Sequence, residues 1–307
     1  MVSTPDISVA IILVNWNGLD FTKACLESLR KVTFSHFKVV LVDNASENEE
    51  GALLKSAFPE IELIQNTQNL GFAGGNNVGI RWALAQGFSH VCLLNNDTEV
   101  EPDFLEELVI KFRQGKSTGI VQPMILFLHQ AKEIWSAGGK WIPNLGRAIT
   151  LGDREPLVNY RVKSSQIDWA TGCCMLVSRE AIQQSGLLNE QYFIYFEDVE
   201  WSLRIRSQGF GIELAPKSIV YHEAGAASKK SQAEGVLSPR VFYYHVRNQF
   251  FLLRQHRAYW GFGYHLARFF FWMLYFLGRR RFKKMKAVAK GIRDGFREKL
   301  QTHPVWP

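Results

Sequence analysis

The chain has few cysteines, and they form none of the patterns in which cysteines usually do chemistry. Its 307 residues include only four, and their spacing matches neither a zinc site nor a disulfide framework. We therefore expect Cys25, Cys92, Cys173 and Cys174 to be buried thiols in a reducing cytoplasm.

Repeats and low-complexity tracts are also absent, and the aromatic run at residues 269–277 is shorter than the about 20 apolar residues that span a bilayer. The first predicted strand begins at residue 7, so we expect no secretory signal ahead of it. What is present is a globular composition, with 47% hydrophobic and 21% charged residues. Length and composition favour one large domain, residues 1–255, and an appended tail, residues 256–307.

Apolar runs alternate with helical segments along the first third of the chain. Residues 7–14 are almost continuously apolar, which is typical of a strand buried on both faces. Shorter runs predict further strands at residues 38–42, 61–64 and 90–94. The alternation predicts a doubly wound α/β sheet with helices on both faces.

Two helices are expected between these strands. The first follows residue 18, where Asp20 is suited to cap it and Phe21, Leu26 and Leu29 fall roughly on one face. The second covers about residues 49–58.

A glycine-rich segment, Gly71-x-x-Gly74-Gly75-x-x-x-Gly79, opens a third helix. It is neither a Walker A motif nor Gly-x-Gly-x-x-Gly. Its glycines still allow the backbone to approach a diphosphate or a sugar closely at the start of a helix. Tight packing at the helix start is the alternative interpretation.

Each of the four predicted strands ends in polar side chains. The segments are Asn15-Trp16-Asn17-Gly18, Asp43-Asn44-Ala45-Ser46, Gln65-Asn66 and Asn95-Asn96-Asp97. Any one of them is explained by a turn or a helix cap. Four at one edge of one sheet favour a ligand crevice, because open parallel sheets bind ligands at the carboxyl ends of their strands.

The second half of the chain is less regular. We expect a helix over residues 102–115, an irregular region over 122–166, a strand over 169–177 and a short helix over 179–186. Strand character returns at residues 211–214 and 219–222. His222 ends the last of these segments, where a neutral imidazole is able to bind a divalent metal.

Two acids, Glu197 and Asp198, follow an aromatic-rich segment at the start of a predicted helix. Aromatic neighbours exclude water from a carboxylate, which raises its proton affinity and suits it to act as a general base. The alternative is that both acids favour the helix dipole and that Glu200 pairs with Arg204.

In this order, the motifs resemble family 2 glycosyltransferases of the GT-A fold, in particular the rhamnosyltransferase-like branch. The resemblance spans about residues 7–255. Besides the strand ends and the glycine-rich segment Asn69 to Asn77, it rests on Gly172-Cys173-Cys174-Met175, Phe196-Glu197-Asp198-Val199-Glu200-Trp201, Tyr221-His222 and Tyr244-His245-Val246-Arg247-Asn248.

The resemblance implies a fold, a set of site residues and a cofactor. The fold is a Rossmann-like mixed sheet, and the cofactor is Mg²⁺ or Mn²⁺ bound by Asp97 and His222. Asp198, with Glu197 beside it, stands at the catalytic base, and Asp43 at the position that reads a pyrimidine base. The implied nucleotide-sugar-binding positions are Val14, Asn15, Asn17, Asp43, Asn44, Gly71, Gly75, Asn76, Asn77, Asn95 and Asn96. Asn95 replaces the first acid of the family's Asp-x-Asp motif, and an amide is a poorer cation ligand than a carboxylate.

The implied activity is an inverting transfer of a sugar, with dTDP-rhamnose as the favoured donor and UDP-sugars behind it. The implied acceptor is a glycan or a lipid-linked glycan of the cell surface. A non-catalytic nucleotide-sugar-binding subunit is the alternative, although Asp97 and Asp198 are both present. A nucleotidyltransferase would carry a basic glycine-rich loop after the first strand, and residues 15–18 are not such a loop.

The net charge of +7 is concentrated in the tail. The cations there are Arg279, Arg280, Arg281, Lys283, Lys284, Lys286, Lys290, Arg293, Arg297 and Lys299, against Asp294 and Glu298. A basic segment after an aromatic run favours peripheral attachment to an anionic surface, here the inner face of the cytoplasmic membrane. The alternative is that the run packs on the core and the basic face is solvated. No recognised motif supports nucleic-acid binding.

Overall fold

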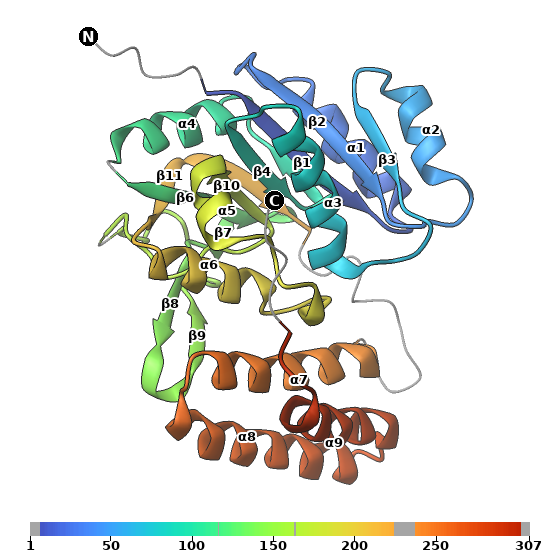
Figure 1. Cartoon of the computed structure of the whole chain (residues 1–307), viewed down its shortest axis with the longest axis vertical. Helices are drawn as coiled ribbons and strands as arrows, with labels where there is room; N and C mark the ends of the chain where they lie inside the picture. Colours follow the sequence, from blue (N-terminus) through green and yellow to red (C-terminus); the bar gives the residue numbers. More distant parts are fainter. Residues whose placement is uncertain (1–6, 116, 163, 224–236, 302–307) are drawn as a thin grey trace.

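A computed structural model describes residues 7–115, 117–162, 164–223 and 237–301 of the chain (Figure 1). Within these residues one large sheet runs in the order β3-β2-β1-β4-β10-β6-β11-β5, and β7 pairs with β6. Its strands are β1 (Val9–Asn15), β2 (Phe37–Asp43), β3 (Glu62–Gln65), β4 (His90–Leu94), β5 (Thr98–Val100), β6 (Thr118–Phe127), β7 (Gln130–Ser136), β10 (Cys174–Ser178) and β11 (Gly211–His222).

Helices cover both faces of this sheet, and a second cluster of helices lies below it in Figure 1. The helices are α1 (Leu19–Leu29), α2 (Glu50–Ala57), α3 (Gly71–Ala85), α4 (Phe104–Gln114), α5 (Arg179–Ser185), α6 (Glu197–Ser207), α7 (Pro239–Gln255), α8 (Tyr259–Gly278) and α9 (Phe282–Arg297). The separate hairpin consists of β8 (Gly139–Ile142) and β9 (Arg147–Thr150). The predicted mixed sheet with helices on both faces is confirmed.

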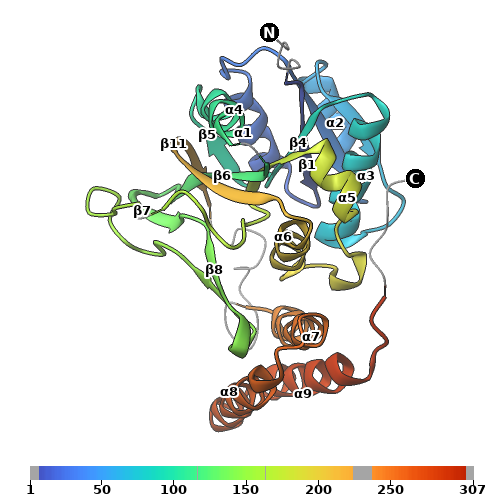
Figure 2. The same cartoon turned by 60° about the vertical axis from the view of Figure 1, so that its left-hand side comes forward.

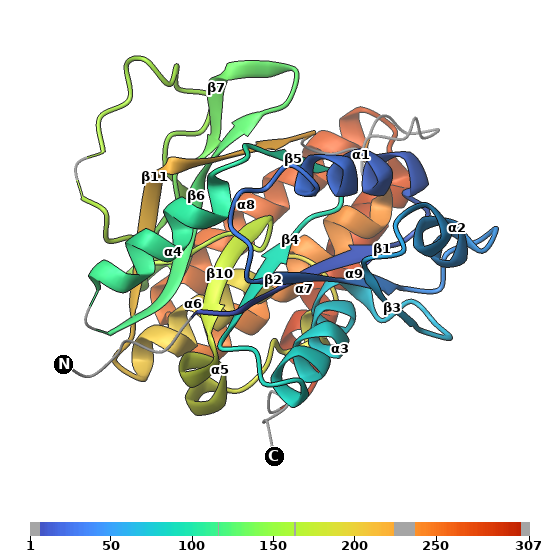
Figure 3. The same ribbon diagram turned by 90° about the horizontal axis from the view of Figure 1, so that it is seen from above.

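The core lies on the two faces of β1 and its neighbours, because alternate residues of a strand point to opposite faces. Ile11 packs with residues of α1 on one face, and Ile12 packs with Ile80 of α3 on the other. Figure 3 shows α1 and α4 on one side of the sheet and α3 and α5 on the other. All four cysteines are buried and free, as expected.

The polar strand ends meet at one edge, as predicted. Strand β1 pairs in parallel with both β2 and β4, and β2 pairs in parallel with β3. In this register Asn15 lies opposite Asp43, and Asp43 lies opposite Gln65. Parallel pairing therefore places the carboxyl ends of β1, β2, β3 and β4 at the same edge of the sheet.

Three predictions about secondary structure in the second half were wrong. The region 122–166 contains most of β6 and all of β7, β8 and β9. Gln122 and Pro123 interrupt the apolar pattern of β6. Gln122 is nevertheless buried, and its side chain accepts a 2.8 Å hydrogen bond from the Thr171 N–H. The predicted strand 169–177 begins only at Cys174. Segments 211–214 and 219–222 form one strand, β11, whose register shifts between Ala215 and Ile219.

Helix α1 also differs from its prediction. Gly18 occupies the N-cap without a side-chain bond, so Asp20 does not cap the helix, and Phe21 is exposed. The helix is rotated so that Thr22 is buried, where its hydroxyl donates a 2.7 Å hydrogen bond to Asn15 Oδ1. A buried polar contact has thus displaced an aromatic side chain from the core-facing side.

The glycine-rich segment lies inside α3 and is not a loop. A Cβ at Gly79 would lie 2.5 Å from Ile12 Cγ2, so the absence of a side chain lets α3 pack directly on β1. Gly71, at the first position of α3, has a φ of 72°, a conformation that glycine adopts without strain.

Helices α7, α8 and α9 form a three-helix unit with its own apolar core (Figure 2). Phe250, Phe269 and Val288 belong to this core. No helix in the described residues combines the length and apolarity needed to cross a bilayer. Helix α7 contacts both this unit and the loop before α6, and the division of the chain at residue 255 stays a prediction.

We expect Gly79→Ala to lower the free energy of unfolding by about 1–3 kcal/mol, because the added methyl group must push α3 away from Ile12. The matched control is Gly263→Ala in α8, where a Cβ would meet nothing within 4 Å. That change should raise stability by about 0.5–1 kcal/mol. Urea denaturation followed by circular dichroism measures both. Equal stability of the two variants would contradict the close approach of α3.

Candidate active site

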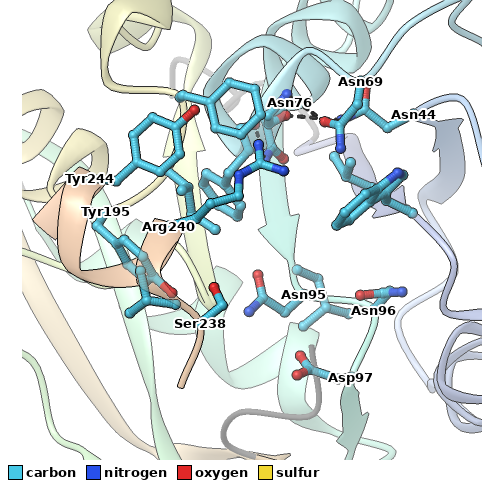
Figure 4. Close-up of a pocket in the computed structure, with 18 residues that line it drawn as sticks. Asn44, Asn69, Asn76, Asn95, Asn96, Asp97, Tyr195, Ser238, Arg240 and Tyr244 are labelled. Carbon is cyan, nitrogen blue, oxygen red and sulfur yellow. Dashed lines mark hydrogen bonds between the residues drawn. The ribbon is translucent and has the colours of Figure 1, made fainter. Parts of the chain in front are cut away.

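A cavity of about 360 Å³ opens at the carboxyl edge of β1 and β4 (Figure 4). Its walls come from these strand ends, the start of α3, the segment before α6 and the first turns of α7. The lining residues are Val14, Trp16, Asn44, Asn69, Gly71, Phe72, Asn76, Leu94, Asn95, Asn96, Asp97, Phe193, Ile194, Tyr195, Ser238, Arg240, Val241 and Tyr244.

Seven of the predicted site residues line this cavity. They are Val14, Asn44, Gly71, Asn76, Asn95, Asn96 and Asp97. Asn44 hydrogen-bonds through both ends of its amide: Nδ2 donates to Gly71 O at 3.1 Å, and Oδ1 accepts from Leu70 N at 3.0 Å. It thereby fixes the chain that enters α3. No described residue hydrogen-bonds to the side chain of Asn95, so its amide is available to a ligand.

Other predicted residues lie behind the cavity wall, where the protein itself uses their polar atoms. Buried Asn15 donates to Glu50 Oε2 at 2.9 Å. The Asp43 carboxylate accepts from the backbone N–H groups of Ser46 and Gly51, each at 2.9 Å. These bonds shape the turn that leads from β2 into α2, and a role for Asp43 in reading a base stays a prediction.

Asn17, Gly75 and Asn77 also lie outside the cavity lining. Asn17 Oδ1 accepts a 2.8 Å hydrogen bond from Glu47 N. Gly75 packs against Val14, whose Cγ1 would lie 2.9 Å from a Cβ at that position. Buried Asn77 donates to Leu188 O at 2.9 Å. Their contribution to a bound ligand would be through the residues that they support.

Asp97 and His222 are brought together by the pairing of β5 with β11. His222 lies opposite Thr98, the residue after Asp97, and His222 Nε2 is 3.2 Å from Asp97 Oδ1. Both side chains are largely buried, and neither Asp97 Oδ1 nor His222 Nδ1 has a hydrogen-bond partner in the described part of the chain. The ring of Trp135 packs edge-on against His222, with centroids 4.4 Å apart.

Two such ligands fit a hard divalent cation whose other ligands come from a substrate and from water. No group of three His, Cys, Asp or Glu side chains suited to a metal occurs in the described part of the chain. Mg²⁺ is commonly bound by one or two carboxylates together with substrate phosphates, so Asp97 is the main protein ligand to expect. The unpartnered oxygen of Asp97 is therefore consistent with a cation that binds with its substrate, while the role of both residues stays a prediction.

Glu197 and Asp198 occupy the first turn of α6. Asp198 accepts hydrogen bonds from Gly172 N at 2.9 Å and from Val199 N at 2.8 Å. Burial raises the pKa of Asp198 above its ordinary value, although these backbone N–H groups act in the opposite direction. Burial, and then the charge of Asp198, raises the pKa of Glu197 well above its usual range, and no described residue hydrogen-bonds to Glu197 Oε2.

The two sets of acids lie in one neighbourhood. Burial, followed by the charge of Asp97 and then by Cys25 and Asp198, raises the pKa of the Cys173 thiol. Hydrogen bonds connect the two sets as well: Gly172 N donates to Asp198 Oδ2 at 2.9 Å, and Cys173 O accepts at 2.8 Å from Asn95 N, two residues before Asp97. Glu200, in contrast, forms a 2.8 Å ion pair with Arg204, which confirms the structural interpretation of that acid.

Several lining residues were missed at the sequence level. Trp16 had a signal, because it stands between Asn15 and Asn17 at the polar end of the first apolar run. Phe193 and Tyr195 belong to the aromatic segment noted before Glu197. Tyr244 belongs to the segment of residues 244–248 on which the resemblance rests, but no role was assigned to it. Arg240 had no signal, because it reaches the cavity only through the docking of α7. Figure 4 shows Arg240, a cation suited to phosphate, among the side chains around the cavity.

Relatives of the chain are named transferases. A hexosyltransferase of low-salt glycan biosynthesis, Agl10 from Haloferax volcanii, is 29% identical over 66% of this chain and 63% of its own length. The dTDP-rhamnosyl transferase RfbF of Shigella flexneri is 28% identical over 72% of each chain. The N-acetylglucosaminyl-diphospho-decaprenol L-rhamnosyltransferase of Mycobacterium tuberculosis is 23% identical over 81% of this chain and 85% of its own length.

Solved structures share the fold at low sequence identity. GalNAc-T7, crystallised with UDP, GalNAc and Mn²⁺, is 17% identical, with a TM-score of 0.62 over 84% of this chain and 50% of its own. The mannosyltransferase PcManGT of Pyrobaculum calidifontis, in complex with GDP-Man and Mn²⁺, is 15% identical, with a TM-score of 0.58 over 97% of this chain and 92% of its own.

The sheet topology, the helices on its two faces and these structural neighbours are those of the GT-A glycosyltransferase fold. The family model described as glycosyl transferase family 2 matches residues 10–186, which is more than half of the chain. The chain therefore belongs to glycosyl transferase family 2.

Proposed function

We propose that this family 2 glycosyltransferase moves a sugar, with rhamnose favoured, from a nucleotide-diphosphate donor to a glycan or lipid-linked glycan of the cell surface, with inversion. One observation carries the proposal. A single cavity is lined by an amide-rich strand edge, by Asp97 of the Asp97–His222 pair and by Arg240. The buried Asp198, on a separate element, accepts a hydrogen bond from Gly172, and the next residue, Cys173, accepts one from the backbone of the cavity residue Asn95.

The donor side of the cavity would bind the nucleotide and its diphosphate. Val14, Gly71 and Asn76 offer a narrow apolar and amide-lined space for the base and ribose. Asp97 and Arg240 would face the diphosphate, Asp97 through a divalent cation and Arg240 directly. When bound, Mg²⁺ or Mn²⁺ would supply Lewis-acid stabilisation of the leaving diphosphate.

Asp198 would act on the acceptor. Its carboxylate takes the proton from an acceptor hydroxyl while that oxygen forms a bond to the anomeric carbon. The bond from this carbon to the diphosphate oxygen breaks on the opposite face, and the nucleotide diphosphate leaves. The raised pKa of Asp198 strengthens it as a base, and its hydrogen bonds from Gly172 and Val199 hold its orientation.

The choice of donor and acceptor is supported by the names of relatives. Two of them are named as rhamnosyl transferases, one with dTDP in its name and one with a diphospho-decaprenol acceptor in its name. Identities of 28% and 23% make rhamnose the first donor to test and UDP-sugars the next.

The donor is tested by nucleotide release from dTDP-rhamnose, UDP-glucose, UDP-galactose and UDP-N-acetylglucosamine, each with Mn²⁺ or Mg²⁺. We expect one donor to turn over, and we expect both EDTA and Asp97→Ala to abolish release, because Asp97 lies at the proposed diphosphate position. Failure of every donor, together with no nucleotide binding by calorimetry, would refute the proposal.

We expect Asp198→Asn to lower transfer by about 10²–10⁴-fold while nucleotide binding by calorimetry persists. An asparagine keeps the shape but does not accept a proton. The wild-type rate should fall with decreasing pH at a pH above the ordinary aspartate pKa, because burial raises the pKa and the base must be ionised. Unchanged transfer by the variant would remove Asp198 from catalysis and favour the alternative of a binding subunit.

A lipid-linked acceptor would place the enzyme at a membrane surface. One face of α8 is suited to contact that surface. One side of α8 buries His265, Phe269 and Phe276 in the three-helix unit. The other side exposes large apolar residues: Tyr259, Trp260, Tyr264, Leu266, Phe270, Phe271, Leu274, Tyr275 and Leu277. Exposed cations follow at Arg279, Arg280, Lys286, Lys290, Arg293 and Arg297. An aromatic face beside exposed cations suits anionic lipid headgroups.

We expect the double variant Trp260→Ser, Phe271→Ser to weaken binding to phosphatidylglycerol vesicles by about tenfold or more, because two exposed aromatic rings would no longer enter the bilayer interface. Val158→Ser is the matched control, because this apolar side chain is 77% exposed on a different segment. Co-sedimentation measures binding. Equal binding by wild type and double variant would show that the aromatic face is simply solvated.

A further inference from the structure

The segment that leads into the proposed base has an unusual backbone. We call residues 191–196 the α6 entry loop. Phe193, Tyr195 and Phe196 have φ angles of 63°, 73° and 70°. Bulky residues rarely adopt positive φ, and such conformations persist only when the surrounding structure fixes them.

The carbonyl groups of the α6 entry loop are fixed from outside the loop by two helices. From α7, Asn248 Nδ2 lies 2.8 Å from the carbonyl oxygens of Tyr192, Ile194 and Tyr195. From α3, the Phe72 N–H donates to Phe193 O at 2.7 Å.

Arg247 completes this set. Its Nη2 donates to Gln191 O at 2.6 Å and to Tyr192 O at 3.2 Å. Five consecutive carbonyls, from residue 191 to residue 195, therefore accept hydrogen bonds from α3 or α7. Arg247 Nε also donates to Asn248 Oδ1 at 3.0 Å, which directs the Asn248 amide nitrogen at the loop.

The α6 entry loop connects two parts of the proposed site. Phe193, Ile194 and Tyr195 line the cavity, and Asp198 follows three residues after Tyr195 in the first turn of α6. Any shift of the loop carbonyls would therefore move both the cavity wall and the start of the helix that carries Asp198.

We propose that Asn248 is a positioning residue for sugar transfer, which holds the α6 entry loop and thereby sets Asp198 against the cavity. The proposal rests on the proposed role of Asp198 as base. It gives a function to the Arg247-Asn248 pair, which the sequence singled out without assigning it a task. Asn248 is fully buried, does not line the cavity and donates its side-chain hydrogen bonds to these loop carbonyls, so its effect on a substrate is indirect.

An amide is required at this position because three carbonyl oxygens converge on its nitrogen. Asn248→Asp keeps the size of the side chain but directs an oxygen at these acceptors, which turns attraction into repulsion. Gln249→Leu is the matched control. Gln249 is buried next to Asn248 on the same helix, and its Nε2 donates at 2.9 Å to Gly146 O, away from the loop.

We expect Asn248→Asp to lower kcat for transfer by about 100-fold, the cost of a small misplacement of a catalytic group. The dissociation constant for the nucleoside diphosphate should change by less than about twofold, since Val14, Asn44 and Asn76 lie outside the loop. Hydrogen exchange of the backbone amides of residues 193–198 should become faster in this variant and remain unchanged in Gln249→Leu.

Two results would overturn the proposal. One is an exchange rate over residues 193–198 that is the same in Asn248→Asp and wild type. The other is an equal loss of kcat in Gln249→Leu, which would show that any buried amide of α7 matters only for stability. A failure of the proposed function looks different, because wild type then transfers no sugar. In that case hydrogen exchange alone still decides whether Asn248 holds the loop.

Discussion

The parallel pairing of β1 with β2 and β4 is the constraint on which the rest of the site depends. It brings Asn15, Asp43 and the end of β4 to the same level of the sheet. A shift of β1 by one residue would exchange the side chains that face α1 with those that face α3. The apolar packing on both faces therefore also fixes the polar edge, and the glycines of α3 let that helix approach close enough to complete the cavity wall.

Polar residues at this edge divide into two groups. Asn15, Asp43 and Asn44 use their polar side-chain atoms in hydrogen bonds within the protein, where they fix the turns after β1 and β2 and the entry to α3. Among the described residues, the side-chain amide of Asn95 makes no hydrogen bond, although its backbone N–H and carbonyl do, and one oxygen of Asp97 has no hydrogen-bond partner. The first group supports the shape of the site, and the second has polar atoms that are open to hydrogen bonding with a charged substrate.

The features of this molecule that could be predicted are those that a short stretch of consecutive residues determines. The strands β1 and β4 are short apolar runs, and their polar ends follow directly in the chain, so the fold class and the strand-end side of the cavity were accessible. Strand β6 was hidden because Gln122 and Pro123 interrupt it. Arg240 could not be predicted for a different reason, since only the docking of α7 brings it to the cavity. The sequence also showed the right residue types at positions 15 and 43 without showing that their polar atoms bond within the protein.

The dependence of the α6 entry loop on α7 has a consequence for how the protein is made. Synthesis proceeds from the amino terminus, so the sheet and the loop leave the ribosome before residue 248. Until then Ile194 O and Tyr195 O lack the side chain that holds them in the finished protein, and water must solvate them. The part of the chain that carries Val14, Asn44 and Asn76 can therefore assemble first, whereas Arg240 and the geometry around Asp198 are in place only after α7 has been translated and has docked.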